Sequence, residues 1–222
     1  MPREPRVGQR GRVKAAVTSI LFACVCLAQG VWGNPVPGFV EDWTGTELHG
    51  WAGNSVLSNP GTGGVGGSGD GFLIFSRTNS GHLGTASHGI EYGGDWLAAG
   101  ISLVRFRLKD VGAPDPLEIH FVLGVSQQNV WQYNLGFAAP DTGWAMFTVD
   151  LASPDWTQII GTGSFADALQ HVDSVHFRHD RAPYGQFPDN IAGDVGVDRL
   201  ELVSPNVEVL PASWGRIKLL YR

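Results

Sequence analysis

Strict alternation of apolar and polar side chains is the feature that most restricts how this chain folds. The alternation recurs in five segments, which are residues 104–109, 117–123, 131–137, 145–151 and 175–178. In the first segment Val104, Phe106 and Leu108 share one side, and basic residues occupy the other. Successive side chains of a β-strand point to opposite faces, so each segment predicts a strand with one buried face.

Shorter segments and the turns between them extend this pattern to a whole domain. Further strands are predicted at residues 38–43, 72–76 and 195–203, with turn-forming residues at 110–116, 126–129, 139–143 and 153–156. One helix is predicted at 165–171, because Ser164 suits the N-cap and Asp167 the first turn. About eight or nine strands joined by turns predict an all-β fold, an antiparallel β-sandwich (jelly roll) with one short helix.

Composition excludes several other classes of protein. Only 16% of the residues are charged and 31 are Gly, which argues against coiled coils and helical bundles. Hydrophobic residues make up 43% of the chain, which is enough for a packed core. The net charge is −6 and there is no long basic run, so we expect no nucleic-acid partner.

The N-terminus has the pattern of an export signal. Five of the first 14 residues are Arg or Lys, an apolar stretch covers 15–28, and small residues Ala28 and Gly30 precede a predicted cleavage point. The signal peptide is therefore predicted at 1–30, and both Cys24 and Cys26 would leave with it. The apolar stretch is shorter than the ~20 residues of a membrane-spanning helix, so we expect no transmembrane span in the mature chain. An uncleaved N-terminal anchor is the alternative.

The remaining boundaries follow from proline and from the strand pattern. A linker is predicted at 31–37, the β-sandwich domain at 38–203 and a C-terminal tail at 204–222. Pro205 and Pro211 end the last strand. The tail ends in SWGRIKLLYR, which fits either a terminal helix docked on the domain or a sorting or anchoring segment.

The polar sides of the strands supply the candidate ligand-binding residues. These are Arg105, Arg107, Glu118, His120, Gln132, Asn134, His176 and Arg178. If their strands share one sheet, these side chains project from the same face. Planar amides, carboxylates and Arg bind sugar hydroxyls, and aromatic rings stack on sugar faces. The candidate aromatic residues are Trp96, Trp131, Tyr133, Trp144 and Tyr184. Trp131 and Tyr133 fall on the apolar side of their strand, which favours the core for these two. The other interpretation is an ordinary solvated sheet face.

No motif in the chain indicates catalysis. The sequence lacks H-E-x-x-H, C-x-x-C, G-x-S-x-G and a phosphate-binding G-K-[ST] loop. Glycoside hydrolysis needs two carboxyl groups about 5–9 Å apart, and only Glu118 is well placed on a strand. We therefore expect no enzyme activity. The alternative is a small polysaccharide hydrolase or lyase that uses Glu118 and His120.

The order of features along the domain resembles that of a known group of β-domains. The segments that carry the resemblance are Phe39-Val40-Glu41-Asp42, Gly50-Trp51, Gly69-Asp70-Gly71-Phe72-Leu73, Gly93-Gly94-Asp95, Val175-x-Phe177-Arg178 and Gly193-Asp194-x-Gly196-Val197-Asp198. In this order they are similar to laminin B (laminin IV type A) domains and to jelly-roll carbohydrate-binding modules.

The resemblance implies a non-catalytic recognition module of an exported protein, found outside the cell or at its surface. Its partner would be a glycan or an extracellular or surface protein. It also implies a structural calcium near the chain ends, at positions that match Glu41, Asp42 and Asp198, with Asp70 or Asp194 as further donors. A third interpretation is a purely structural envelope protein.

Overall fold

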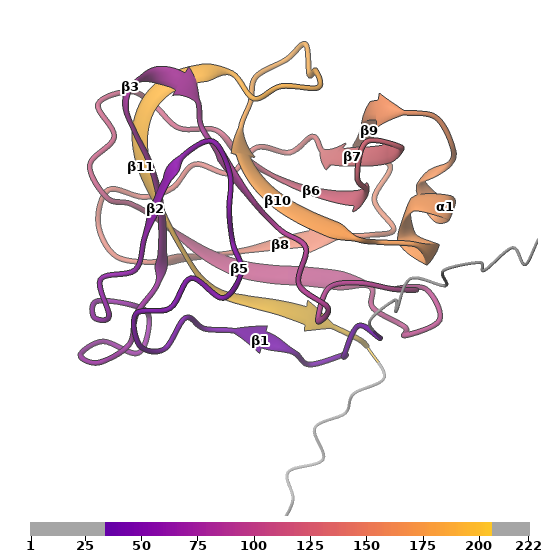
Figure 1. Ribbon diagram of the computed structural model, residues 1–222, viewed down its shortest axis with the longest axis horizontal. Coiled ribbons are helices and arrows are strands. Elements are labelled where there is room, and N and C mark those ends of the chain that lie inside the picture. The colour runs from indigo at the N-terminus through magenta and orange to yellow at the C-terminus, as the bar shows by residue number, and fades with distance from the viewer. Residues whose placement is uncertain (1–33, 206–222) are drawn as a thin grey trace, which may run out of the picture. The chain divides into compact units, whose positions relative to one another are not determined.

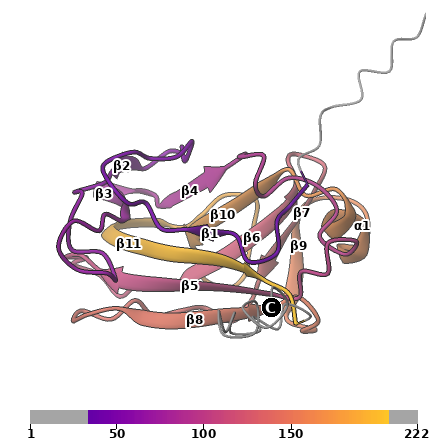
Figure 2. The same cartoon turned by 90° about the horizontal axis from the view of Figure 1, so that it is seen from below.

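The computed structural model describes residues 34–205, and within them two antiparallel β-sheets lie face to face. The predicted signal peptide at 1–30 and the tail from residue 206 onward lie outside the described residues. Figure 1 shows the strands in face view, and Figure 2 shows the two sheets as separate layers. No helix within 34–205 is long and apolar enough to span a membrane.

The first sheet contains six strands. They are β1 (Val40–Glu41), β2 (Val56–Ser58), β3 (Leu73–His82), β5 (Leu103–Asp110), β8 (Ala145–Asp150) and β11 (Asn190–Val203). Their order is β2-β3-β11-β5-β8, and β1 pairs with the last part of β11. We call this layer sheet A.

The second sheet contains five strands and is called sheet B. They are β4 (Gly84–Ser87), β6 (Ile119–Val125), β7 (Asn129–Tyr133), β9 (Trp156–Gly161) and β10 (Ser174–His179). The order is β4-β10-β6-β7-β9, and every pair in both sheets is antiparallel. This architecture confirms the predicted β-sandwich of the jelly-roll type. The short edge strands β2, β4 and β9 are additions that the sequence pattern did not predict.

Aromatic side chains from both sheets fill the space between the layers. Phe106 of β5 is fully buried, and its ring centroid lies 4.9 Å from that of Phe177 on β10 and 6.1 Å from that of Phe121 on β6. Burial of one such side chain contributes roughly 1.5–3 kcal/mol. Because Phe121 and Phe177 point into the core, the residues that alternate with them point away from it, onto the outer face of sheet B.

The one helix within residues 34–205 forms where it was predicted. Helix α1 (Phe165–Gln170) begins after Ser164, whose hydroxyl accepts a hydrogen bond from the N–H of Asp167. The Asp167 carboxylate accepts the N–H of Ser164 in return, which completes a capping box. Phe165 then packs on the rings of Trp131 and Trp156, so the helix closes one end of sheet B.

Candidate functional site

The register of sheet B brings five of the eight predicted site residues to its outer face. His176 of β10 lies opposite Val122 of β6, which in turn lies opposite Gln132 of β7. In the next row Arg178 lies opposite His120, and Asn134 follows directly after β7. Residues of the consecutive strands β6 and β7 and of β10, which follows much later in the sequence, therefore meet on one surface.

Of the other three predicted residues, the two arginines lie on the opposite sheet, and Glu118 lies beside His120. Arg105 and Arg107 lie on β5, which belongs to sheet A, so the sandwich separates them from the outer face of sheet B. The expectation that all eight share one sheet is therefore corrected. Glu118 directly precedes β6, and its Oε1 atom lies 3.3 Å from Nε2 of His120.

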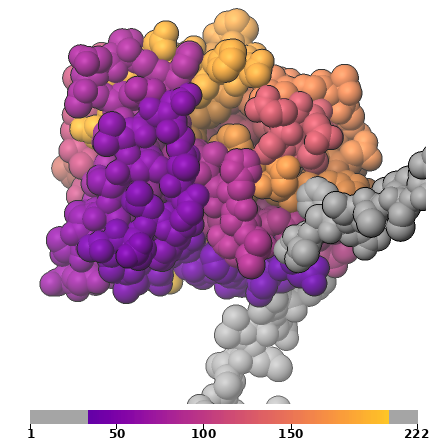
Figure 3. Space-filling model, viewed as in Figure 1, coloured from indigo at the N-terminus to yellow at the C-terminus, as the bar shows by residue number. Residues whose placement is uncertain are grey.

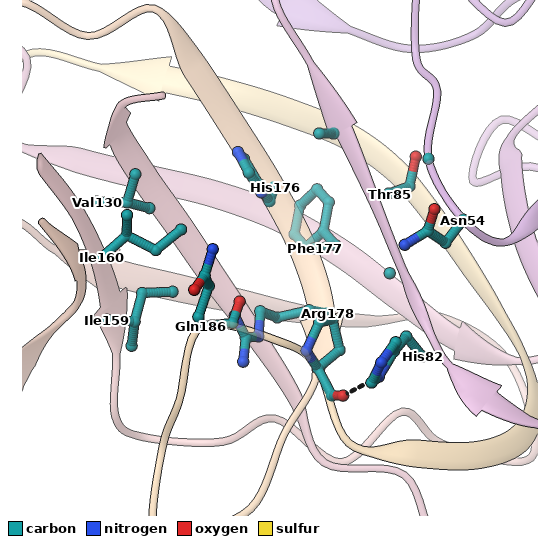
Figure 4. A pocket seen from close by; sticks show the side chains of 14 residues that line it. Asn54, His82, Thr85, Val130, Ile159, Ile160, His176, Phe177, Arg178 and Gln186 are labelled. Carbon is teal, nitrogen blue, oxygen red and sulfur yellow. Dashed lines mark hydrogen bonds between the residues drawn. The ribbon is translucent and has the colours of Figure 1, made fainter. Parts of the chain in front are cut away.

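A pocket of about 200 Å³ opens on the outer face of sheet B, and we call it the outer-face pocket. Figure 3 shows this face of the molecule, where early segments (indigo to magenta) and late segments (orange) border a hollow. Figure 4 shows the pocket from close by. Its lining includes His176 and Arg178 on β10, the aliphatic residues Val130, Ile159 and Ile160, the β4 residues Gly84, Thr85 and Ala86, His82 at the end of β3, and the loop residues Gly53, Asn54, Gln186 and Pro188.

Arg178 binds the loop that follows β10 and has its charge balanced locally. Its Nη2 atom lies 2.6 Å from Oδ2 of Asp180 and donates to the carbonyl oxygen of Gly185 at 2.7 Å. Its Nη1 atom donates to the carbonyl oxygen of Gln186 at 3.1 Å. Burial lowers the pKa of Arg178, and the Asp180 carboxylate opposes that shift. This residue therefore fixes one side of the pocket.

Tyr184 in the same loop covers part of the predicted site. Its hydroxyl donates to the carbonyl oxygen of Asn134 at 3.0 Å, and its ring centroid lies 5.2 Å from that of His120. His120 and Gln132 are both fully buried. As a result His120, Gln132 and Asn134 lie beside the outer-face pocket but do not line it.

Most of the aromatic residues predicted to stack on a ligand have other roles. Trp96 and Tyr133 are buried in the core, Trp131 packs on Phe165, and Nε1 of Trp144 donates to the carbonyl oxygen of Gly63. Tyr184 is the one of the five whose ring lies against His120, and its hydroxyl binds the carbonyl oxygen of Asn134.

Several buried polar atoms on this face have no hydrogen-bond partner within the described residues. They are Nε2 and Oε1 of Gln132, Oδ1 of Asn134, Nε2 of His176 and Nε of Arg178. Each such group costs about 1–3 kcal/mol when it is left unpaired. Their concentration at one place marks a surface where a polar ligand or bound water gains hydrogen bonds.

His176 is held in its neutral form. Burial lowers its pKa to about 4, and the nearby His88 and Arg178 act in the same direction. At neutral pH the imidazole is therefore an uncharged hydrogen-bonding group at the outer-face pocket.

The three acids predicted to bind calcium have separate hydrogen bonds. Glu41 contacts Nδ1 of His49, and Asp42 accepts the N–H of Thr44 at 3.2 Å. Asp198 is fully buried. Residues 34–205 contain no group of three or more His, Cys, Asp or Glu side chains arranged to hold a metal ion. The calcium site at Glu41, Asp42 and Asp198 stays a prediction.

Asp198 instead binds the glycine-rich loop before β3. It accepts the N–H groups of Val65 and Arg199, each at 2.7 Å, and Asp70 accepts the N–H of Gly66 in the same loop. Burial raises the pKa of Asp198 to about 6, and the Asp70 carboxylate adds to this shift. A bound cation would offset the repulsion between these two carboxylates, which concerns Asp198 among the predicted ligands and Asp70 among the further donors.

Comparison with known proteins shows the fold. No family model matches the chain, and no curated protein matches it in sequence. Among solved structures, a family 11 carbohydrate-binding module from Clostridium thermocellum in complex with a β-1,3-1,4-mixed-linked tetrasaccharide is similar. It has a TM-score of 0.50 and 19% identity, with 77% of this chain and 98% of that chain covered.

Two further structures show the same likeness. A solution structure of the module CtCBM11 has a TM-score of 0.50 and 20% identity, with 80% of this chain and 98% of that chain covered. An exo-β-agarase structure has a TM-score of 0.53 and 14% identity, with 74% of this chain but only 24% of the agarase covered. At these identities the likeness shows a fold of the carbohydrate-binding-module type. The resemblance to laminin B domains stays a prediction.

Sequence reasoning missed the loop residues of the pocket. Asn54 and Gln186 lie in irregular segments, where no alternation marks one side chain as facing the sheet. The only sequence signal near Gln186 is the local density of turn-forming residues in 182–189.

Proposed function

We propose that this chain is an exported, non-catalytic module that binds glycan in the outer-face pocket. The observation that carries the proposal is the pocket itself, which combines aliphatic walls with an unpartnered nitrogen of His176. Sites for small ligands are concave and largely apolar, with a few polar groups that orient the ligand. A sugar has both kinds of surface, because its C–H groups are apolar and its hydroxyls form hydrogen bonds.

The similar structures support this proposal, since two of them are carbohydrate-binding modules. The predicted signal peptide supports export. A polysaccharide outside the cell or at its surface is the partner that fits both the predicted export and the likeness to carbohydrate-binding modules. A surface protein partner and a purely structural role are the competing outcomes of the test below.

The site geometry favours binding over catalysis. None of the 14 residues that line the pocket is Asp or Glu, so the pocket offers no pair of carboxyl groups for glycoside hydrolysis. His120, the candidate base, is fully buried beneath Tyr184, with Nδ1 at 2.7 Å from the carbonyl oxygen of Tyr133. It is placed to hold structure and not to touch a substrate.

A glycan array probed with residues 31–222 tests the proposal. Ala86 lines the pocket from β4, and its replacement by Phe would place a ring inside it. We expect Ala86→Phe to lower glycan retention at least tenfold. Thr148→Phe is the matched control, because Thr148 is exposed on the outer face of sheet A.

Three outcomes overturn parts of the proposal. If no glycan is retained, the binding function is wrong. If Ala86→Phe binds as well as the unchanged chain, the site lies elsewhere. If a polysaccharide panel yields new reducing ends or unsaturated products that are lost in Glu118→Gln, the protein is an enzyme.

A further inference from the structure

The side chains that line the outer-face pocket indicate which kind of sugar it binds. The inference below rests on the proposed glycan-binding function. We infer that the pocket holds a single uncharged sugar unit between the side-chain amides of Asn54 and Gln186, above the imidazole of His176. The assignment concerns two loop residues that no strand pattern indicates.

The two amides lie on either side of β10. Figure 4 shows Asn54 on the side of β4 and Gln186 on the side of Val130 and Ile160, with His176 between them. Both residues are exposed and both line the pocket. Neither side-chain amide forms a hydrogen bond to another residue of the described part of the chain, so both are free to bind a ligand.

These groups suit hydroxyls. A carboxamide offers two N–H donors and a carbonyl acceptor, and a sugar hydroxyl both donates and accepts. Two amides can therefore each bind neighbouring hydroxyls of one ring. His176 adds a third contact, because its Nε2 atom is buried and has no partner among the described residues.

The charge of the lining argues for an uncharged ligand. Arg178 carries the one permanent charge among the lining residues, and Asp180 pairs with it at 2.6 Å. Two of its nitrogens are also occupied by loop carbonyl groups. A uronate or sulfate would meet a guanidinium whose charge Asp180 already balances, and an amino sugar would meet no carboxylate among the lining residues, so either would lose hydration with little compensation.

The volume of the outer-face pocket and the loop that borders it indicate that one sugar unit enters the pocket. A volume of about 200 Å³ is below the roughly 300–1,000 Å³ of pockets for drug-sized ligands. The loop at Gly185 to Pro188 borders the pocket and is held by Arg178 and by Nδ1 of His82, which contacts the carbonyl oxygen of Pro188. A chain of sugars therefore places one unit in the pocket and the rest outside it.

Isothermal titration calorimetry with residues 31–222 tests the inference. The probes are neutral gluco-, manno- and xylo-oligosaccharides of two to six units, oligogalacturonates and chitosan oligomers of the same lengths. We expect a neutral series to bind, with the six-unit member at most threefold tighter than the three-unit member. The charged series should bind at least tenfold more weakly.

Variants at the two amides provide the second readout. Asn54→Ala and Gln186→Ala should each weaken neutral binding about three- to tenfold, as expected for loss of one or two hydrogen bonds. Gln170→Ala is the matched control, since Gln170 is exposed on α1 and does not line the pocket. Melting temperatures of all three should stay unchanged, which separates lost contacts from lost folding.

The outcomes separate this inference from the proposed function. If a charged series binds best and Ala86→Phe abolishes it, the function stands and the uncharged unit is wrong. If affinity keeps rising with chain length, or both amide variants bind normally, the single-unit site is wrong. If no oligosaccharide binds, the glycan function is wrong and this inference is wrong with it.

Discussion

Gln132 provides a sharp test of the energetics of the polar face of sheet B. Its side chain is fully buried, and neither Nε2 nor Oε1 has a hydrogen-bond partner within the described residues. The amide lies close enough to Asp180 to lower the pKa of that carboxyl, but the contact falls short of hydrogen-bonding geometry. The burial of this amide therefore costs free energy that its contact with the Asp180 carboxylate offsets only in part.

Replacement of Gln132 by Met removes that cost while it keeps most of the side-chain volume. An unpaired buried polar group costs about 1–3 kcal/mol, so Gln132→Met should raise the free energy of unfolding by that amount. For a domain of this size, each 1 kcal/mol raises the melting temperature by roughly 2–4 °C. Because Gln132 does not line the pocket, glycan affinity should stay nearly constant.

Urea denaturation and calorimetry measure the change, with Gln158→Met as the control. Gln158 lies on the adjacent strand β9, and its Nε2 atom donates to Oδ1 of Asn129 at 2.6 Å. The control should lose about 0.5–1.5 kcal/mol, since a made hydrogen bond is removed. If Gln132→Met is destabilised like the control, the amide is paired in solution and the reasoning is refuted.

Four further predictions concern the helix cap, His176, Asp198 and the calcium prediction. Ser164→Ala should lower the free energy of unfolding by about 0.5–2 kcal/mol, because it removes the N-cap of α1; an unchanged urea midpoint would contradict the cap. His176 has a lowered pKa of about 4, so its contribution to the free energy of unfolding is present above pH ~6.5 and is lost as the pH falls through 4. Urea denaturation at a series of pH values should show that His176→Asn removes this loss of stability in acid. Asp198 has a raised pKa of about 6, so its contribution is present below pH ~4 and is lost as the pH rises through 6, a slope that Asp198→Asn should remove. If calcium offsets the Asp198 and Asp70 charges, EDTA should lower the melting temperature, and Asp70→Asn should abolish that response. A melting temperature that EDTA leaves unchanged would refute the calcium prediction.

Local sequence pattern predicted the central strands and the helix because each carries its own signal. Strand β5 alternates strictly over 104–109, and its inward residues are fully buried in the structure. Helix α1 begins at the predicted cap. The edge strands β2, β4 and β9 were not predicted, since β2 has only three residues, GTAS lacks large apolar residues and TQII lacks alternation. At an edge, pairing with one neighbour decides the structure more than the side chains do.

The candidate site shows the same division between local and tertiary information. Alternation by itself determined that His176 and Arg178 point away from the core, and it did so equally for Arg105 and Arg107. Only the sheet order decided that the first pair lies at the pocket and the second on the opposite side of the sandwich. The alternation of side chains along a strand shows which face of the sheet a residue occupies. It does not show which strand lies beside it, because strand pairing joins segments that are far apart in the chain. For the same reason the loop residues Asn54 and Gln186 became part of a site only once the chain had folded.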